Sequence, residues 1–396
     1  MISRVIGGIL LIVGTSIGGG MLALPIANAG IGFFTSTLLL IFCWLLMTIG
    51  AFYILEANLY LPRGKNMVSM AHLTLGPIGL VIAWFSYLFL LYALLAAYIA
   101  GGGDILGTLI RPLAPLLSNA ENSILFTLAF GFIVYGGIKP VDWANRALMF
   151  GKLGIYLLLV VFIAPHVQLP HLQHVSSHLS INIIMVLITS FGFAIIIPNL
   201  RDYFEDNIST LKKVILIGSI IPLLCYLAWN AVIIGSLPHD GPRALSLLMH
   251  DSNSTSALAS LISQTIQRPF ISALFNTFTA ICMLTAFLGV SLCLVSFLSD
   301  GLHIDNSGFK ALFLSLLTFA PPLLLVIYAP GIYISALSYA GIFCVILLLL
   351  LPVGMSYFGR KRYTSTYLVP GGKVLQCVMV MTSVALLIFS IKDMIL

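Results

Sequence analysis

The sequence predicts an all-α integral membrane protein with eleven transmembrane helices, arranged as two inverted five-helix repeats with discontinuous helices 1 and 6. Three observations predict this fold. The 396 residues are 60% hydrophobic and 8% charged, with a mean hydropathy of +1.12. Apolar runs long enough to cross a bilayer follow one another along almost the whole chain. Two short motifs, Thr15–Gly18 and Thr189–Gly192, nearly repeat each other inside such runs.

The composition excludes a water-soluble protein, since soluble chains average about half apolar and a quarter charged residues. A bilayer core of about 30 Å requires about 20 apolar residues per helix, and backbone groups in lipid must be hydrogen-bonded within their own segment. The eleven stretches that meet this requirement are residues 4–28, 32–59, 78–108, 122–138, 147–166, 180–200, 212–236, 268–299, 309–328, 331–357 and 374–392. The stretch 241–266 is amphipathic and rich in serine, so we expect an external loop with one or two short helices.

Basic residues are distributed unequally between the two sides of this topology. With a cytoplasmic N-terminus, 14 of the 18 basic residues fall on the cytoplasmic side, and Arg111, Arg243, Arg268 and Lys392 fall outside. This bias predicts a cytoplasmic N-terminus and a periplasmic C-terminus. The net charge of +6 reflects loops that face anionic lipid, so we expect the bilayer as a partner and no nucleic acid.

Glycine and proline interrupt the first and sixth spans at corresponding places. The first interruption runs from Gly14 to Gly20 and precedes Pro25, and the second precedes Pro198. Paired interruptions of this kind mark the discontinuous helices of secondary transporters, whose substrate site lies between them near the bilayer midplane. Freed amides suit a carboxylate and freed carbonyls suit an ammonium, and a free amino acid carries both groups.

The two motifs also predict the symmetry of the fold. Thr15 and Thr189 are 174 residues apart, with five predicted spans between the starts of the two interrupted helices. An odd number of crossings places the second copy upside down relative to the first. We therefore expect one repeat at 1–170, an inverted repeat at 171–358, and a cytoplasmic loop with the eleventh helix at 359–396.

The run from Gly14 to Pro25 resembles the first-helix motif of the bacterial aromatic amino acid permeases, the tyrosine and tryptophan transporters of the hydroxy and aromatic amino acid group. Further stretches similar to that family are Tyr92–Leu94, Ala96–Ile99, Thr189–Phe193 and Phe287–Val290. The resemblance covers essentially the whole chain. It implies a LeuT-like fold of the APC superfamily and proton-driven uptake of an aromatic amino acid across the bacterial inner membrane, with no cofactor and a monomeric protein.

Candidate binding residues follow from the two interruptions. We expect the backbone at the first interruption to bind the carboxylate and the amine of the substrate, and Ser190 and Gly192 to complete that site. We expect Phe191, Phe193 and Ala194 to shape the pocket for the substrate side chain. Tyr92 and Asn276 line the same pocket or bond to other polar groups between helices. The full set is Ile17, Gly18, Gly19, Gly20, Ser190, Phe191, Gly192, Phe193, Ala194, Tyr92 and Asn276.

The chain departs from the family pattern after Phe193. Such permeases often carry a histidine before the proline, whereas this chain reads Ala194 and three isoleucines before Pro198. Loss of a hydrogen-bonding group from a site changes discrimination between related ligands. The sequence therefore does not choose between tyrosine, tryptophan and phenylalanine, and a sodium- or proton-coupled permease for small neutral or hydroxylated amino acids, such as serine or threonine, is the alternative.

Lys152, Glu56 and Asp104 are the candidates for proton coupling. Lys152 lies one to two turns into the fifth span, where a lipid-facing cation costs about 3 kcal/mol, so we expect it to face inward. The resemblance implies a proton-coupling role for Lys152, and a lysine that reaches the cytoplasmic interface is the alternative. Glu56 and Asp104 lie near predicted helix ends, where an interfacial carboxylate with a structural role is the competing interpretation.

Sodium is the less favoured coupling ion. Sodium-driven members of the implied fold supply paired hydroxyls from span eight, whereas this chain has Thr285 followed by Ala286. Backbone carbonyls of the first helix remain possible sodium ligands.

The sequence predicts neither a metal centre nor a catalytic centre. The six cysteines fall within or at the ends of predicted helices without CxxC spacing, which indicates packing residues. His171, His174 and His178 could share one helical face, but Pro170 and the absence of a neighbouring cysteine or carboxylate argue against a metal site. No HExxH or Walker motif occurs, so a membrane-embedded enzyme or metal-binding protein is the distant alternative.

Overall fold

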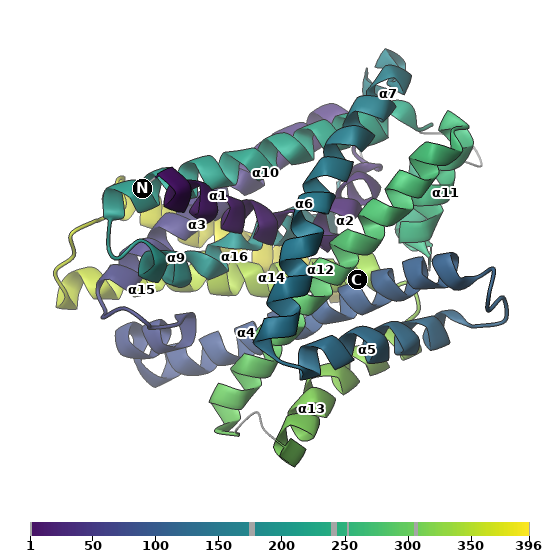
Figure 1. Ribbon diagram of the computed structural model, residues 1–396. Helices are drawn as coiled ribbons and strands as arrows, with labels where there is room; N and C mark the ends of the chain where they lie inside the picture. The colour runs from purple at the N-terminus through teal and green to yellow at the C-terminus, as the bar shows by residue number, and fades with distance from the viewer. Residues whose placement is uncertain (1, 174–178, 239–243, 252, 305–307, 396) are drawn as a thin grey trace.

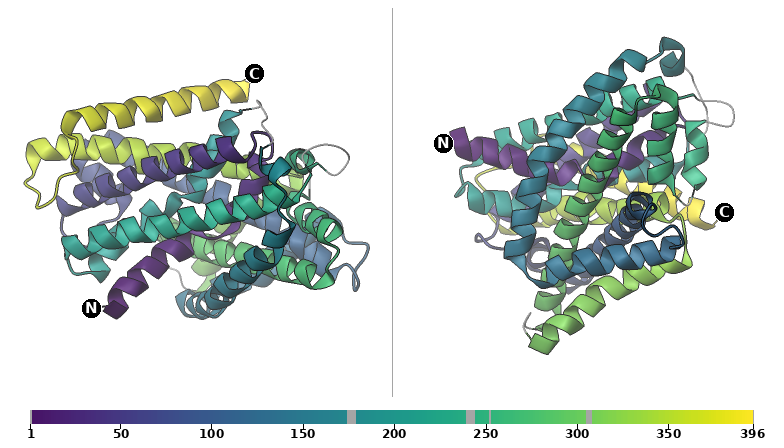
Figure 2. Two further views of the ribbon diagram at one scale, coloured as in Figure 1. Left: turned by 90° about the horizontal axis from the view of Figure 1, so that it is seen from above. Right: turned by 45° about the vertical axis from the view of Figure 1, so that its right-hand side comes forward.

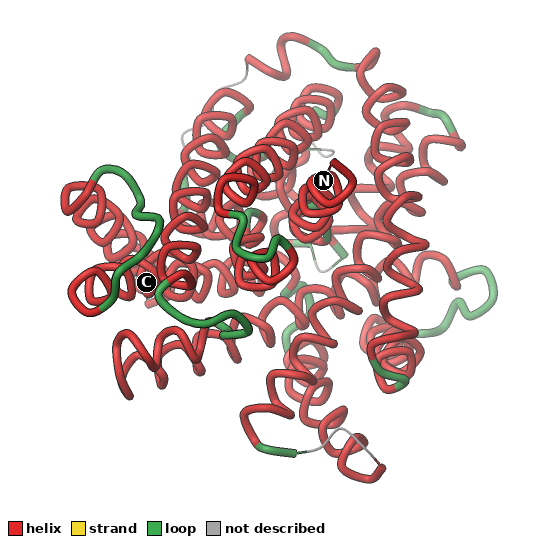
Figure 3. The backbone as a smooth tube through the Cα atoms, turned by 60° about the vertical axis from the view of Figure 1, so that its left-hand side comes forward, coloured by secondary structure: helices red, strands yellow, loops and turns green. Residues whose placement is uncertain are grey.

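The computed structural model describes residues 2–173, 179–238, 244–251, 253–304 and 308–395. Within these ranges the chain forms helices and loops without a strand (Figure 3). The first half contains α1 (Ile2–Ser16), α2 (Gly19–Asn28), α3 (Phe33–Leu59), α4 (Met67–Ile110), α5 (Asn119–Tyr135), α6 (Ile138–Ile163), η1 (Ala164–His166) and α7 (Leu169–Gln173). The second half contains α8 (Ile181–Ser190), η2 (Gly192–Ile196), α9 (Ile197–Tyr203), α10 (Ile208–Ser236), η3 (Leu245–His250), α11 (Ser254–Ile266), α12 (Pro269–Leu302), α13 (Gly308–Tyr328), α14 (Tyr333–Cys344), η4 (Val345–Leu350), α15 (Leu351–Arg362) and α16 (Gly372–Ile395).

The helices confirm an all-helical, multi-pass membrane protein. Among the described residues, nine helical segments are long and apolar enough to cross a bilayer, and the bent pair α1–α2 makes a tenth. The remaining predicted span corresponds to α5, which has 17 residues. A helix of that length extends about 26 Å, slightly less than the bilayer core of about 30 Å.

The third span differs from its prediction at one end. α4 begins at Met67 rather than near residue 78, and it is kinked at Gly76, whose φ is +78°. Only glycine adopts this conformation without strain, and Pro77 cannot donate a hydrogen bond to the preceding turn. About three turns of helix, residues 67–77, therefore precede the predicted span. The external segment predicted at 241–266 contains the short helices η3 and α11 where it is described.

The long helices α4 and α10 each pack against several neighbours. α4 packs against α12, α14, α5 and α13, and α10 packs against α1 and α3. α16 lies along the outside of the bundle, where it contacts η4 and α8 (Figure 2). α1 begins at the left of Figure 1, and the right-hand view of Figure 2 places the end of α16 on the opposite side of the molecule. All ten residues of α2 are buried, so the second half of the first broken helix lies in the protein interior.

The two interrupted helices cross at their breaks. α1 and α2 are bent by 52° across the break, and α8 gives way to the 3-10 helix η2 before α9. α1 packs against η2, and α2 packs against α8. The helix before the first break, α1, therefore contacts the segment after the second break. The helix before the second break, α8, contacts the helix after the first break. This pattern is expected for two antiparallel helices that cross at their breaks.

Candidate functional site

The first break exposes backbone groups between α1 and α2. α1 ends at Ser16, and Gly18 precedes α2 in an extended conformation with φ −150° and ψ −150°. Amides in the first turn of a helix have no intrahelical acceptor, which leaves those of Gly19 and Gly20 available to a ligand. The partial positive charge of a helix N-terminus favours an anion at this position.

The second break repeats the local chemistry of the first. In each motif the threonine and the serine donate their hydroxyl protons to carbonyls four residues earlier, at 2.7–3.0 Å. Such back-bonding weakens and bends helices. Ser16 is the last residue of α1, and Ser190 is the last residue of α8. The repeated motifs therefore end their helices in the same way.

Tyr226 on α10 joins the two breaks. Its hydroxyl oxygen lies 2.6 Å from the carbonyl oxygen of Ser16 and 2.8 Å from that of Ser190, and its side chain is fully buried. The single hydroxyl proton serves one carbonyl at a time. A Cβ on Gly20 would lie 3.1 Å from the Ser190 Oγ, so a glycine at this position lets α2 and α8 approach closely.

Two further side chains reach carbonyls of the first break. Lys152 on α6 is 2% exposed, and its Nζ donates to the carbonyl of Ile17 at 2.5 Å. Tyr333 at the start of α14 donates its hydroxyl proton to the carbonyl of Gly19 at 2.5 Å. Lys152 makes no salt bridge with any residue that the structure describes. It therefore faces the interior of the bundle, with a backbone carbonyl as its partner.

Sequence reasoning missed Tyr226 and Tyr333. A buried tyrosine in an apolar span needs a partner for its hydroxyl, and this requirement is the one signal that the sequence offered. The identity of that partner depends on helix crossings that no local pattern records.

Buried aromatic side chains surround the breaks. Phe191, Phe193 and Ala194 are fully buried, and the ring of Phe191 packs edge-on against Tyr226 with centroids 5.1 Å apart. A Cβ on Gly19 would lie 2.6 Å from the ring of Tyr98, so this α4 side chain covers the first break. The structure therefore brings together the predicted residues 17–20 and 190–194.

Two other predicted pocket residues lie elsewhere. Tyr92 donates its hydroxyl proton to the carbonyl of Leu317 at 2.8 Å, which places it between α4 and α13. Asn276 on α12 has a buried Oδ1 that finds no hydrogen-bond partner among the described residues. It precedes Met283, the α12 residue near Gly19, by seven positions, or about 10 Å of helix. Neither residue contacts the breaks through a hydrogen bond within the described chain.

The predicted acid Glu56 is held in an ion pair. Its fully buried carboxylate accepts two hydrogen bonds from Arg360 on α15, at 2.7 and 2.8 Å. It also accepts hydrogen bonds from the hydroxyls of Tyr60 and Ser356 and from the amide of Val369. These contacts tie the end of α3 to α15 and to the segment before α16. They favour a structural role for Glu56 over proton transfer.

Of the three histidines noted in the sequence, the structure describes His171. His171 Nδ1 lies 3.2 Å from the carbonyl oxygen of Gly235, and His174 and His178 lie outside the described residues. No group of three or more metal-ligating side chains occurs in the part of the chain that is described.

The contact of α12, the predicted span eight, with the first break bears on sodium binding. A Cβ added at Gly18 would lie 3.6 Å from the Cβ of Ala286. Because alanine has no hydroxyl, α12 offers no hydroxyl oxygen from this residue.

Comparison with known proteins identifies the family. A model of the tryptophan/tyrosine permease family matches residues 1–390. The chain belongs to this family. Tyrosine-specific transport system 1 of Haemophilus influenzae is 32% identical over 376 residues, which cover 94% of this chain and 92% of that protein. A tryptophan-specific transport protein of Pseudomonas aeruginosa is 29% identical over 91% of this chain and 87% of its own length. Glutamine transporter 2 of Aliivibrio fischeri is 28% identical over 94% of this chain and 95% of its own length.

Membership confirms the resemblance seen in the sequence. The permease is a transport protein rather than an enzyme, and its helices span the membrane several times. The relatives are named for different substrates, namely tyrosine, tryptophan and glutamine. Membership of the family therefore does not identify the substrate of this chain.

Proposed function

We propose that this permease imports an aromatic amino acid, namely tyrosine, tryptophan or phenylalanine, by proton symport across the bacterial inner membrane. The observation that carries the proposal is the meeting of two helix breaks at Tyr226, whose hydroxyl lies within hydrogen-bond distance of the Ser16 carbonyl and of the Ser190 carbonyl. In secondary transporters such breaks bind the substrate near the bilayer midplane. The tyrosine and tryptophan specificities named for two relatives support an aromatic side chain.

The two breaks supply complementary groups for an amino acid. The amides of Gly19 and Gly20 bind the carboxylate at the N-terminus of α2, and carbonyls at the ends of α1 and α8 bind the ammonium. Phe191, Phe193 and Ala194 shape the pocket for the side chain.

Lys152 is the group that we propose for proton coupling. A buried ammonium without a carboxylate partner is costly, and the described residues provide Lys152 only with the carbonyl of Ile17. A substrate carboxylate bound at the same break compensates the ammonium charge, so proton and substrate enter together. The missing hydroxyl at Ala286 supports protons over sodium.

We further propose eleven spans in two inverted repeats, with a cytoplasmic N-terminus, a periplasmic C-terminus and α5 as the fourth span. The antiparallel crossing of the broken helices supports the inverted relation. Charged pairs at the end where α1 begins, including Arg4 with Glu205 and Arg63 with Asp206, support a cytoplasmic location of that end. Both breaks come from one chain, which supports a monomeric transporter.

A second candidate is transport of a neutral polar amino acid. The glutamine transporter of A. fischeri matches this chain almost as closely as the tryptophan-specific relative does. Serine and threonine belong to the same class of small polar substrates.

The experiment that tests the proposal is uptake of labelled tyrosine into proteoliposomes of the pure protein, under an inward proton gradient and without sodium. Unlabelled tryptophan, phenylalanine, glutamine, serine and threonine serve as competitors. Gradient-driven uptake that only aromatic amino acids inhibit supports the proposal. Uptake that requires sodium overturns the proton mechanism, and inhibition by glutamine, serine or threonine alone overturns the aromatic assignment.

A further inference from the structure

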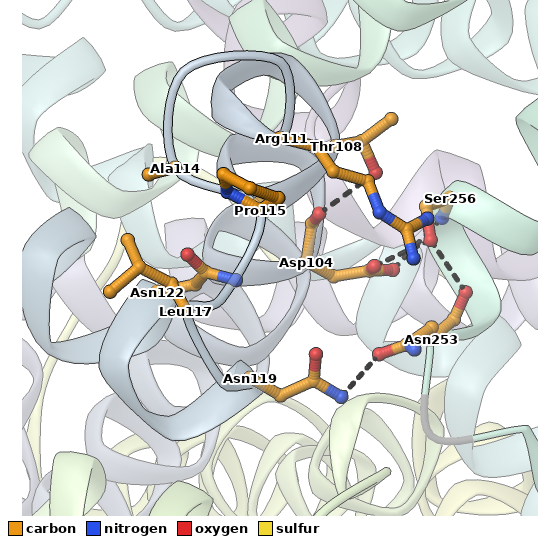
Figure 4. A pocket seen from close by; sticks show the side chains of 11 residues that line it. Asp104, Thr108, Arg111, Ala114, Pro115, Leu117, Asn119, Asn122, Asn253 and Ser256 are labelled. Carbon is orange, nitrogen blue, oxygen red and sulfur yellow. Dashed lines mark hydrogen bonds between the residues drawn. The ribbon is translucent and has the colours of Figure 1, made fainter.

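Charged side chains near the ends of the long helices differ in whether the protein compensates their charge. Near the end of α4, the carboxylate of Asp104 accepts hydrogen bonds from the Ser256 amide at 2.9 Å and from the Ser256 hydroxyl at 2.5 Å (Figure 4). It also accepts one from the Thr255 hydroxyl. These donors lie in the first turn of α11, where the helix dipole stabilises a carboxylate. The contacts favour a structural role for Asp104 over proton coupling.

Two lysines, where α15 ends and α16 begins, have no such compensation. Lys361 and Lys373 are exposed, and neither forms an ion pair with a residue that the structure describes. Lys361 Nζ donates a hydrogen bond to the hydroxyl oxygen of Tyr357 at 3.0 Å and lies 4.1 Å from the centroid of its ring. The charge of Lys373 acts on the same phenol, and α15 packs against α16. Two ammonium groups from different helices therefore gather near one tyrosine hydroxyl.

An apolar surface adjoins these lysines. Val374, Val378 and Met381 on α16 are each more than half exposed, and their spacing of four and three residues places them on one face of the helix. α16 is long and apolar enough to cross the membrane and lies along the outside of the bundle, so this face contacts lipid (Figure 2). Lys373 precedes this face by one position. The exposed ring of Tyr357 suits the same depth, since tyrosines are enriched at the membrane interface.

We infer that this surface binds an anionic phospholipid, with the phosphate on Lys361, Lys373 and the Tyr357 hydroxyl and an acyl chain along the apolar face of α16. Because Lys361 donates to the phenol oxygen, the hydroxyl proton of Tyr357 is available to a phosphate oxygen. Basic clusters beside membrane-spanning helices attract anionic head groups. A choline head group fits less well, since its own positive charge is repelled by both lysines. The inference does not depend on which amino acid the permease transports.

Bound lipid links two helices and stabilises the folded protein. Without an anion, the like charges of the two lysines repel each other across the contact between α15 and α16. A phosphate that contacts both removes this repulsion. Any ligand that binds only the folded state raises the temperature of unfolding with its concentration. Thermal unfolding therefore measures lipid binding without a transport assay.

The first test titrates phosphatidylglycerol into the pure protein in an uncharged detergent and obtains the dissociation constant from the rise in unfolding temperature. We expect Lys361→Gln with Lys373→Gln to raise this constant about thirtyfold, because each lysine near an anionic head group contributes about fivefold. The matched control is Lys65→Gln with Lys213→Gln, which removes two exposed lysines outside the cluster and keeps the wild-type constant. An unchanged constant in the first pair, or an equal rise in both pairs, overturns the inference.

The second test separates a defined head-group site from diffuse attraction and from a free anion. Tyr357→Phe keeps the ring beside Lys361 and removes the hydroxyl, so we expect the dissociation constant to rise about twofold to tenfold. We expect phosphatidylcholine and inorganic phosphate to give no comparable stabilisation. A wild-type constant in Tyr357→Phe overturns the site, and equal stabilisation by inorganic phosphate or by phosphatidylcholine overturns the anionic lipid as its occupant. The proposed transport is decided separately, by the uptake assay.

Discussion

Replacement of Tyr226 by phenylalanine tests whether the contact between the two breaks matters for transport. The variant keeps the ring that packs against Phe191 and removes the hydroxyl that lies 2.6 Å from the Ser16 carbonyl and 2.8 Å from the Ser190 carbonyl. Tyr226 is fully buried, so protein surrounds these carbonyls once the hydroxyl is lost. The two oxygens then face each other without the donor that holds them together.

The size of the effect follows from the loss of that donor. A buried acceptor left without its donor costs about 1–3 kcal/mol. Since about 1.4 kcal/mol corresponds to a factor of ten, we expect kcat/KM for tyrosine uptake to fall about 5- to 150-fold. The measurement is the initial rate of uptake into proteoliposomes, corrected for the amount of folded protein.

Tyr156→Phe is the matched control. The hydroxyl of Tyr156 donates to the carbonyl of Cys225 at 2.9 Å, one residue before Tyr226 on the same helix. This variant loses a similar hydrogen bond away from the breaks, so we expect a similar loss of thermal stability with near wild-type uptake. Equal uptake by the two variants would refute the role assigned to Tyr226.

Three further predictions concern the breaks and the ion pair of α3. Lys152→Ala abolishes uptake driven by a pH gradient and leaves some equilibrium binding of tyrosine, because the amides of Gly19 and Gly20 still bind the carboxylate; full gradient-driven uptake would contradict this. Gly19→Ala lowers the initial rate of uptake at least about tenfold, because its Cβ would lie 2.6 Å from the ring of Tyr98, whereas Gly154→Ala, with open space around it, retains the wild-type rate. Glu56→Gln removes the charge that pairs with Arg360 on α15, and we expect it to destabilise the protein by about 3 kcal/mol. Thermal unfolding in detergent measures that loss, and loss of the pH dependence of uptake in this variant would instead assign Glu56 to proton coupling.

The positions of the helices and of both breaks were predictable from local sequence. Apolar run length determines where a helix can cross lipid, and glycine with back-bonding hydroxyls weakens a helix within a single turn. The motifs that begin at Thr15 and Thr189 therefore place the ends of α1 and α8 before any tertiary contact is considered. The start of α4 at Met67 was not predictable in this way, because its first turns lie outside the main apolar run.

The partners of each side chain depended on the tertiary structure. The depth of Lys152 and the acidic character of Glu56 were visible in the sequence, but their partners come from residues 135 and 304 positions away. The same holds for Tyr226, which reaches a break 210 residues before it, and for Asp104, which stabilises a helix about 150 residues later. Helix formation is governed by neighbours within a few residues, whereas a polar group buried in a bundle is satisfied by whichever helix crosses it. The sequence alone therefore determined the family and the breaks, and only the packing of distant helices decided which groups meet at them.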